Sequence, residues 1–541
     1  MPSENNCRRH CARIERLPWR RRSANVVGAI VGALLVGVGS SGCDEPTGAK
    51  AKVQFDPAPQ GIVFAATYSH DGRQIALACE DKSVAVHDAK TGTLVRRLEG
   101  HTERVWIAVF SPDGKSLASC SGEYAAPQQG GSVKVWDLET GKERHHLEGH
   151  KGLVFNVAFS PDGTSLLSAG WDGLVNVWDA TTGKKKATLT DHSGPVRTIV
   201  FAPDGKTFAT ASFDGTVRLW DAANLKNVAT LNAHSQGVQC LSFSPNGNYL
   251  ATCGRPTGNP PDDEIVLWNV ATGKEQGRIG GHRGNILCLS FSHDGKMLAS
   301  CGGRFAEYGE VKLYEVASGM VRSTFSDHRE WVECVRFSPD GKTLISAGGY
   351  RRGIPGQVIV RSLPELLEKK PEGKISAAQL GTLWTTIGKP DAADAYQAVM
   401  TMVAAPGSVP AFLKERVKPS TTKVDEKRVA KLVVDLDSNI FRERQRASKE
   451  LDEMRELAGP LLRKVLDSKP PPEVEKRIAG LLKQYEVPTI GTELLRALRS
   501  IEILESIGDS EARQVLEALA KGIPDALITR EAQASLRRMP K

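Results

Sequence analysis

A five-residue string, Phe-Ser-Pro-Asp-Gly or a near copy, occurs seven times between residues 68 and 341. Successive copies lie 42 to 49 residues apart, and an alternating apolar run precedes and follows each one, as at 154–159 and 165–169. Proline fixes φ and glycine accepts a positive φ, so each copy predicts a tight turn between two strands of a hairpin. The period therefore restricts most of the chain to an architecture of seven equivalent β units.

Two further apolar runs complete each unit. One ends in Trp-Asp or a variant, as at Trp178-Asp179, and the other leads to Gly-His, Asp-His or Ala-His, as at Gly149-His150. Four short strands per period with these two marks closely resemble the blades of WD40-repeat proteins. The resemblance covers roughly residues 52–363 and implies an all-β, seven-bladed propeller.

A propeller must close into a ring, because an open ring exposes two sheet edges. The last unit ends at 358–361 without a run for an outer strand, whereas the stretch 52–56 precedes the first complete unit. WD40 rings commonly close with an N-terminal strand, so the resemblance predicts that 52–56 completes the seventh blade.

Units three and four each contain a histidine, a hydroxyl residue, an aspartate and a tryptophan. These are His150, Ser168, Asp172 and Trp178 in one unit, and His192, Thr210, Asp214 and Trp220 in the next. Ser, His and Asp could form a hydrolase triad, but a catalytic set is expected once and this set recurs with the repeat. In WD40 families these residue types form a hydrogen-bonded network, which satisfies buried polar groups. The resemblance thus implies a structural network, and we predict no catalytic residues.

Seven cysteines lie in the repeats, at 79, 120, 240, 253, 288, 301 and 334. The number is odd and no Cys-x-x-Cys pair is present, which argues against a metal site or a complete disulfide framework. Three of them stand where other units have alanine, which is typical of core residues. Because Walker, His-Glu-x-x-His and Gly-x-Ser-x-Gly motifs are missing as well, we expect neither a metal nor a cofactor.

The period stops near residue 364, and runs rich in Ala, Leu, Glu and Arg follow. Apolar residues recur at intervals of three and four from Leu494 to Ile507, which predicts an amphipathic helix, and Asp509 begins another. These helix pairs resemble HEAT-like repeats, with 437–485 as an earlier copy in which Pro460 and the prolines at 470–472 lie between helices. The combination with a WD40 ring is similar to proteins common in planctomycete genomes.

Residues 1–42 have the three parts of a secretory signal: a basic region, an apolar stretch at 26–38, and small residues before Cys43. Ser-Gly-Cys resembles a bacterial lipobox, in which the cysteine is acylated, although Ser40 stands where leucine is usual. We expect export and lipid attachment at Cys43, with ordinary cleavage or an uncleaved anchor as alternatives. The segment carries seven Arg and two Glu, about +5 of the net charge of +8. The remainder is too weakly basic to predict a nucleic-acid partner.

Antiparallel strand order places the loops that lead into each unit at the same end as the loops between its second and third strands. Four units carry insertions in the latter loops, at 123–131, 255–264, 304–310 and 350–357. Arginine and aromatic residues on exposed loops are frequent binding hot spots. The predicted partner-binding residues at this end are Trp106, Arg255, Arg304, Phe305, Tyr308, Trp331, Tyr350 and Arg351. Tolerated drift of surface loops is the alternative.

The sequence thus predicts a non-catalytic scaffold for other proteins, tethered by lipid to the periplasmic side of a bacterial membrane or secreted. An enzyme with its site in the central channel is one alternative, and it would need titratable residues on the first strands. The positions that we expect to line the channel show no obvious polar constellation: Ala65, Ile107, Asn156, Thr198 and Cys240. A cytosolic WD40 scaffold is the second alternative.

The predicted organisation has five segments. They are a signal peptide at 1–42, a linker at 43–51, the propeller at 52–363, a linker at 364–377 and an α-helical, HEAT-like domain at 378–541.

Overall fold

A computed structural model describes most of the chain beyond its first fifty residues. The described residues are 53, 55, 61–254, 264–282, 284–304, 308–349, 356–363, 375–419, 426–438, 440–453, 455–468, 470–485, 491–524 and 526–539. The predicted signal peptide, Cys43 and both predicted linkers, apart from 375–377, lie outside them.

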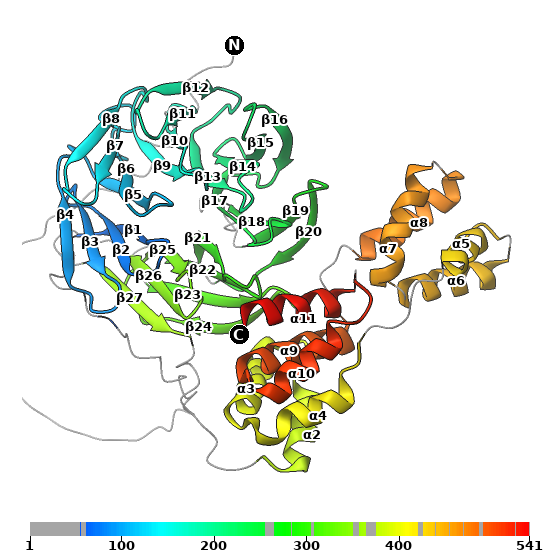
Figure 1. The fold of residues 1–541 in the computed structure, drawn as a ribbon. Coiled ribbons are helices and arrows are strands. Elements are labelled where there is room, and N and C mark those ends of the chain that lie inside the picture. The colour runs from blue at the N-terminus through cyan, green and yellow to red at the C-terminus, as the bar shows by residue number, and fades with distance from the viewer. Residues whose placement is uncertain are drawn as a thin grey trace, which may run out of the picture. The chain divides into compact units, whose positions relative to one another are not determined.

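Seven antiparallel sheets form a ring of blades around a common centre (Figure 1). Blades one to four comprise β1 (Val63–Tyr68), β2 (Gln74–Cys79), β3 (Val84–Asp88), β4 (Leu94–Leu98); β5 (Val105–Phe110), β6 (Ser116–Ser121), β7 (Ser132–Asp137), β8 (Glu143–Leu147); β9 (Val154–Phe159), β10 (Ser165–Gly170), β11 (Val175–Asp179), β12 (Lys185–Leu189); and β13 (Val196–Phe201), β14 (Thr207–Ser212), β15 (Thr216–Asp221), β16 (Asn227–Asn232). Blades five to seven comprise β17 (Val238–Phe243), β18 (Tyr249–Gly254), β19 (Ile265–Asn269), β20 (Lys274–Ile279); β21 (Asn285–Phe291), β22 (Met297–Arg304), β23 (Tyr308–Glu315), β24 (Met320–Phe325); and β25 (Val332–Phe337), β26 (Thr343–Gly348), β27 (Gln357–Ser362). The first strand of every blade lies nearest the centre and contacts the first strands of both neighbouring blades, including β25 with β1.

The repeated string forms the turn between the first and second strands of every blade. Its glycine has a φ between 69° and 72° in all seven copies, a left-handed conformation that L side chains rarely adopt. In blade two, Ser111 Oγ donates to Asp113 Oδ1 and accepts from the Ser116 backbone N–H. The string therefore builds the turn predicted from it, with serine and aspartate satisfying the turn's polar groups.

The seventh blade has three strands, β25, β26 and β27, among the described residues. Val53 and Phe55 are buried in one apolar cluster with Val63 of blade one and with Ile345 and Val360 of blade seven. These two side chains therefore fill the junction where the ring closes. No strand is assigned to them, and the backbone pairing predicted for 52–56 falls mostly on residues outside the described set.

The helical region has two separate cores. Its elements are α2 (Ala377–Thr386), α3 (Ala392–Ala404), the 3₁₀ turn η2 (Pro406–Ser408), α4 (Val409–Arg416), α5 (Glu426–Asp435), α6 (Phe441–Glu453), α7 (Arg455–Asp467), α8 (Pro472–Tyr485), α9 (Thr492–Ile507), α10 (Ser510–Leu519) and α11 (Leu527–Arg538). Helices α2–α4 share a core with α9–α11, whereas α5–α8 form their own. Helices α5–α8 are thus an insertion into a bundle that is formed by α2–α4 and α9–α11.

The helices predicted over 494–507 and after Asp509 are present as α9 and α10, and Asp509 caps α10 by accepting from the Ala512 backbone N–H. The placement of Pro460 between helices is wrong, because it lies inside α7. Among the described helices, none has both the length and the apolar character that a membrane span requires.

Buried ion pairs join the bundle to blade six. Glu315 of β23 accepts from Arg499 of α9 at 2.5 and 2.8 Å and from Arg322 of β24 at 2.9 Å. Arg322 also donates to Glu502 of α9 at 2.8 and 3.0 Å, and it lies 4.8 Å from the ring of Tyr396. Charge-assisted hydrogen bonds between two acids and two arginines make this contact specific, although the buried Nε of Arg322 has no hydrogen-bond partner.

Candidate binding site at the mouth of the ring

The predicted quartets of blades three and four are hydrogen-bonded networks. In blade three, the His150 ring contacts Asp172 at 3.0 Å and Ser168 Oγ at 2.8 Å, and Trp178 donates to the same hydroxyl at 2.9 Å. In blade four, His192 contacts Asp214 at 2.8 Å and Thr210 at 2.7 Å, and Trp220 donates to Thr210 at 2.9 Å. Both hydroxyl residues are 0% exposed. A hydroxyl that no substrate can reach does not act as a nucleophile in this conformation.

Equivalent histidine–hydroxyl contacts are present in four more blades, where other residue types replace some members of the quartet. His101, His234, His282 and His328 contact Ser119, Thr252, Ser300 and Ser346. In blade seven, Arg361 replaces the tryptophan, donating to Ser346 Oγ at 2.7 Å and pairing with Asp327. Burial lowers the pKa of His328 to about 3, so this imidazole is neutral at pH 7.

Every inner strand carries a β-bulge at the same register, shortly after it begins. The pairing with the second strand skips one residue in each blade, and the skipped residues are Phe64, Trp106, Phe155, Arg197, Gln239, Leu287 and Glu333. A bulge re-aims the side chain of the extra residue. Arg197 of blade four lies 5.6 Å from the ring of Trp106 of blade two, across blade three. Such a contact requires both side chains to turn towards the centre. We call the seven skipped residues the bulge ring.

The positions expected to line the channel stand one residue after the bulge ring. Ala65, Ile107 and Cys240 are buried among apolar neighbours in the core cluster, and Asn156 and Thr198 are buried as well. The residue before each of them belongs to the bulge ring. Strict alternation of side chains along a strand gives no sign of a bulge, and the argument against a polar group near the centre was wrong for this reason.

Aromatic side chains of four consecutive blades gather around the bulge ring. The aromatic cluster consists of Phe64, Trp106, Tyr124, Phe155, Trp171 and Phe213, with successive ring centroids 4.6–6.5 Å apart. Tyr124 is 44% exposed, and Trp106, Trp171 and Phe213 are half-buried. Trp106 is held by its indole N–H, which donates to the Gly122 carbonyl at 2.9 Å. The cluster is thus a fixed aromatic surface that solvent reaches.

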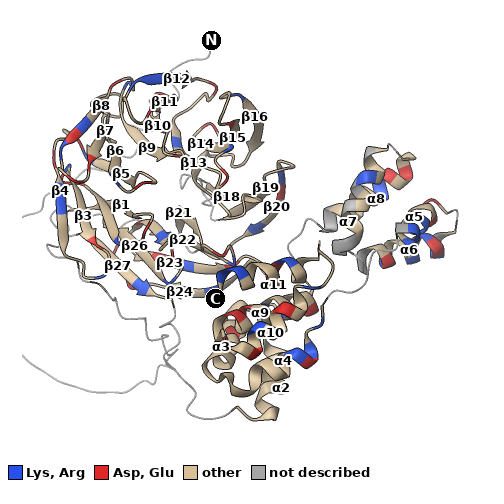
Figure 2. Ribbon diagram, in the orientation of Figure 1, with Lys and Arg blue, Asp and Glu red and all other residues tan. Residues whose placement is uncertain are grey.

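Two charged residues, Arg197 and Glu333, complete the bulge ring. Figure 2 shows other charged residues of the propeller on outer strands such as β4, β8 and β12. Arg197 is half-buried and lies 5.0 Å from the Phe155 ring. Burial raises the pKa of Glu333 to about 7, while Arg197 opposes the shift. We call the bulge ring and the aromatic cluster together the mouth of the ring. On one side of it, the aromatic cluster can stack against flat or apolar groups. The other side offers the Arg197 guanidinium, the Gln239 amide and the Glu333 carboxyl group.

The predicted partner-binding residues divide into three groups. Trp106 belongs to the aromatic cluster. Arg304, Tyr308 and Trp331 are described at the same end; Arg304 is exposed, and the other two are half-buried. The insertion of blade six lengthens β22 and β23, which pair as far as Arg304 and Tyr308, so it is less of a free loop than expected. Arg255, Phe305, Tyr350 and Arg351 lie outside the described residues.

Sequence reasoning did not single out Phe64, Trp171 and Phe213 of the aromatic cluster. Trp171 and Phe213 occupy short turns, which looked uninformative beside the long insertions. The available signal was that both turns carry a large aromatic residue directly before Asp-Gly, on adjacent units.

Sequence comparison identifies the repeats. The family described as WD domain, G-beta repeat matches residues 92–137, 141–179, 183–221, 225–269, 273–314 and 319–351. Each match runs from the outer strand of one blade into the inner strands of the next, so the sequence repeat straddles two blades. No curated protein sequence matches the chain. The chain therefore carries WD40 repeats, and its fold is a seven-bladed WD40 propeller followed by a helical region.

Proposed function

We propose that this protein is a non-catalytic scaffold that binds another protein at the mouth of its ring. WD40 propellers generally serve as protein-interaction scaffolds. The observation that carries the proposal is the aromatic cluster, because large aromatic side chains fixed at a solvent-accessible surface are typical anchors of protein interfaces.

The remaining residues at this end extend the proposed surface. Arg304, Tyr308 and Trp331 would contribute from blades six and seven, and Arg255, Phe305, Tyr350 and Arg351 from the loops predicted at the same end. Charged residues at the rim of an interface affect association rate and specificity more than affinity. We therefore assign the anchoring role to the aromatic cluster and the selective role to these loops.

Paired substitutions test the binding surface. Tyr124→Ala with Trp171→Ala should weaken binding of a partner, purified by affinity from membranes, by at least about thirtyfold, as for central anchors elsewhere. The matched control is Lys115→Ala with Lys342→Ala, beside the turns at the opposite end of the ring, which should retain the wild-type affinity. If the control pair abolishes binding and the aromatic pair does not, the proposed end is wrong.

An enzyme with its site near the centre has one observation in its favour. The Glu333 carboxyl, with a pKa of about 7, could exchange a proton at neutral pH. We favour binding because the network hydroxyls of the described residues are buried and six aromatic side chains form one side of the proposed site. A Glu333→Gln variant that keeps partner affinity but loses a measured turnover would support the enzyme instead.

We further propose that the chain is exported and anchored by a lipid on Cys43, on the basis of the leader and the Ser-Gly-Cys sequence. Metabolic labelling with a fatty acid should label the wild type and leave Cys43→Ala unlabelled. After cell fractionation, the wild type should be found with the membranes and the variant in the soluble fraction. An unlabelled wild type, or a variant that stays in the membrane, would overturn the lipid anchor.

A further inference from the structure

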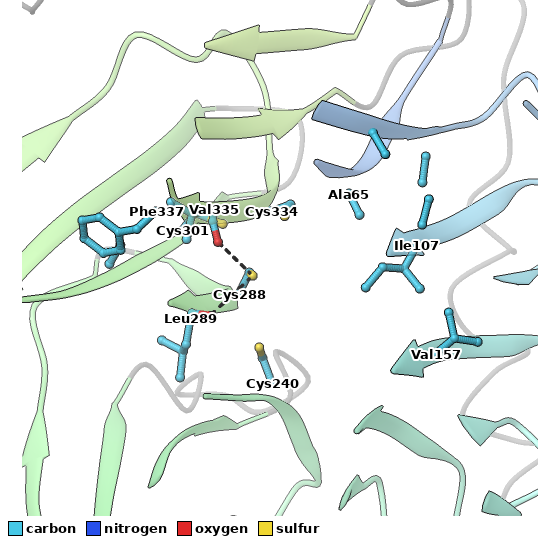
Figure 3. Packing of buried hydrophobic residues seen from close by; sticks show 14 of the residues in the cluster. Ala65, Ile107, Val157, Cys240, Cys288, Leu289, Cys301, Cys334, Val335 and Phe337 are labelled. Atoms are coloured by element: carbon cyan, nitrogen blue, oxygen red, sulfur yellow. Dashed lines mark hydrogen bonds between the residues drawn. The ribbon is translucent and has the colours of Figure 1, made fainter. Parts of the chain in front are cut away.

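Three equivalent cysteines follow the bulge ring on consecutive blades. Cys240, Cys288 and Cys334 come one residue after Gln239, Leu287 and Glu333, on β17, β21 and β25. Cys301 of β22 lies directly opposite Cys288 in the strand pair. Figure 3 shows these four side chains on one side of the centre, and each is buried with a free thiol.

Most of the propeller cysteines are ordinary packing residues. The Cys253, Cys301 and Cys334 thiols each donate to a backbone carbonyl of the next blade, at 3.7, 3.4 and 3.5 Å. These contacts explain why a thiol can replace alanine at such positions. Cys120 is likewise 0% exposed.

The Cys288 thiol likewise lies within hydrogen-bonding distance of the Val335 and Leu289 carbonyls, at 3.7 and 3.9 Å (Figure 3). It differs from the other thiols because a guanidinium also contacts its sulfur. Arg336 of β25 has Nη1 at 2.6 Å from Cys288 Sγ, and the same atom donates to the Val335 and Leu289 carbonyls at 2.8 and 3.2 Å. Arg336 is half-buried, and no carboxylate of the described residues forms an ion pair with it. A cation held among carbonyls and thiols favours an anion at the one sulfur that it contacts.

We propose that Cys288 is a reactive thiolate, held by Arg336, which hydrogen peroxide oxidises and which then forms a disulfide with Cys301. Reactive cysteines sit beside cationic groups where small reagents can reach them, whereas structural cysteines are inert. Cys288 is 5% exposed and its neighbours Arg336 and Glu333 are half-buried, so solvent approaches the sulfur from the centre of the ring.

The electrostatics of the cluster agree with one ionised thiol among four. Hydrogen bonds with Cys240, Cys301 and Cys334, together with the charge of Arg336, lower the pKa of Cys288 well below its ordinary value. The pKa values of the other three thiols are raised, by those hydrogen bonds and by burial. Glu333 is the remaining ionisable neighbour, and protonation near neutral pH reduces its opposition to the thiolate.

The reaction needs only peroxide as oxidant. The Cys288 thiolate attacks one peroxide oxygen, the O–O bond breaks, and hydroxide leaves a sulfenic acid on Cys288. The Cys301 sulfur then attacks the sulfenic sulfur, the S–O bond breaks, and the Cys301 proton leaves with the oxygen in water. The two cysteines lose two electrons, which reduce peroxide to the level of water once hydroxide takes up a proton.

The strand pairing suits this disulfide. Residues directly opposite in an antiparallel pair have Cα atoms about 4.5 or 5.5 Å apart, within the range of about 4.4 to 6.8 Å that disulfides span. Their side chains also lie on the same face of the sheet. A disulfide of Cys288 with Cys240 or Cys334 would have to bridge two blades, whereas Cys301 belongs to the same sheet as Cys288. We therefore assign Cys301 as the partner.

Mass spectrometry of the folded, full-length protein tests the proposal. After hydrogen peroxide treatment and alkylation of free thiols, peptide mapping should find a Cys288–Cys301 disulfide, while Cys120 remains alkylatable only after unfolding. In the untreated protein at pH 7, Cys288 should react with iodoacetamide at least about tenfold faster than Cys120. Arg336→Gln should slow this alkylation, and Arg336→Lys should restore part of it.

Several results would overturn the assignment. A Cys288 that stays reduced under peroxide, or reacts no faster than Cys120, removes the reactive thiolate. A disulfide of Cys288 with Cys240 or Cys334 removes Cys301 as the partner. Cys301→Ala keeps Arg336 but removes one hydrogen bond to the thiolate, so Cys288 should be oxidised more slowly and should remain as a trapped sulfenic acid. Complete loss of oxidation at Cys288 in this variant, with an unchanged melting temperature, would contradict the order of the reaction.

Discussion

At the scale of single residues, six of the seven blades have, among the described residues, one buried hydroxyl group that contacts a histidine. In five of them this hydroxyl also accepts from a tryptophan or an arginine. The histidine belongs to the loop that leads into the blade, and the hydroxyl belongs to the second strand. Where an aspartate is present, it lies in the turn after the second strand and contacts the histidine, as Asp214 contacts His192. Asp214 also accepts from the Ser193 and Thr216 backbone N–H groups at 3.0 and 2.9 Å. A change at one member therefore leaves several buried groups without partners.

Asp214→Ala should lower the free energy of unfolding by about 1–3 kcal/mol, because His192 and two backbone N–H groups lose their acceptor. Burial raises the pKa of Asp214, but hydrogen bonds from His192 and Thr216 outweigh it and the net shift is downward. A carboxylate with a depressed folded pKa contributes stability above its ordinary pKa and loses it as the pH falls further. Denaturant titrations should therefore show a larger loss of stability below about pH 4 in the wild type than in the variant.

Asp191→Ala, one residue before His192 and exposed, is the matched control and should change stability by no more than about 0.5 kcal/mol. Equal losses for the two variants would mean that the network does not hold the blade. If partner binding by folded Asp214→Ala also falls, the purely structural role of the quartet is wrong.

At the scale of elements, the bulge and the closure of the ring decide what the propeller presents. The bulge turns one side chain per blade towards the centre, and this places Arg197 against Trp106 and Phe155. Closure depends on a short N-terminal segment, since the seventh blade lacks a fourth strand of its own among the described residues. The bulge recurs in every blade, whereas the closure depends on a few residues outside the regular repeat.

Phe55→Ala should destabilise the protein by about 3–5 kcal/mol, the cost of removing a buried phenylalanine, because its ring fills the junction of blades one and seven and lies 5.2 Å from the His87 ring. Deletion of residues 44–57 should lower the melting temperature further. Thermal unfolding measures both. Val95→Ala on β4, 49% exposed, should leave the melting temperature unchanged; a Phe55 variant that melts with it would refute the closure.

At the scale of the whole molecule, the helical bundle is fixed to blade six through Glu315. Burial would raise the pKa of this group, but hydrogen bonds from Arg499 and the charge of Arg322 lower it to about 2. Its contribution to stability is therefore complete above its ordinary pKa of 4.5 and is lost as the pH falls towards about 2.

Glu315→Ala should lower the free energy of unfolding by about 3–5 kcal/mol, because Arg322 and Arg499 would remain buried without their shared partner. Limited proteolysis should then release the bundle from the propeller faster than in the wild type. Glu264→Ala removes the exposed pair with Arg278 and should cost less than about 1 kcal/mol. If proteolysis of the two variants proceeds at the same rate, the Glu315 cluster does not hold the bundle in place.

The number of blades, the turns and the quartets could be predicted from the sequence because each depends on local chemistry that recurs. A glycine at positive φ and an alternating run occur in all seven units, and a histidine stands at a fixed distance from a hydroxyl residue in six of them. The sequence also predicted the helices of 494–519 from their periodicity. Tertiary structure alone decided the bulge ring, because a bulge depends on how two strands pair and leaves the residue types unchanged. It also decided the meeting of Arg197 with aromatic residues of other blades, the contact of Arg336 with Cys288, and the joint at Glu315. Those contacts join segments tens to hundreds of residues apart, and their partners are chosen by how the strands and helices pack, which no local pattern encodes.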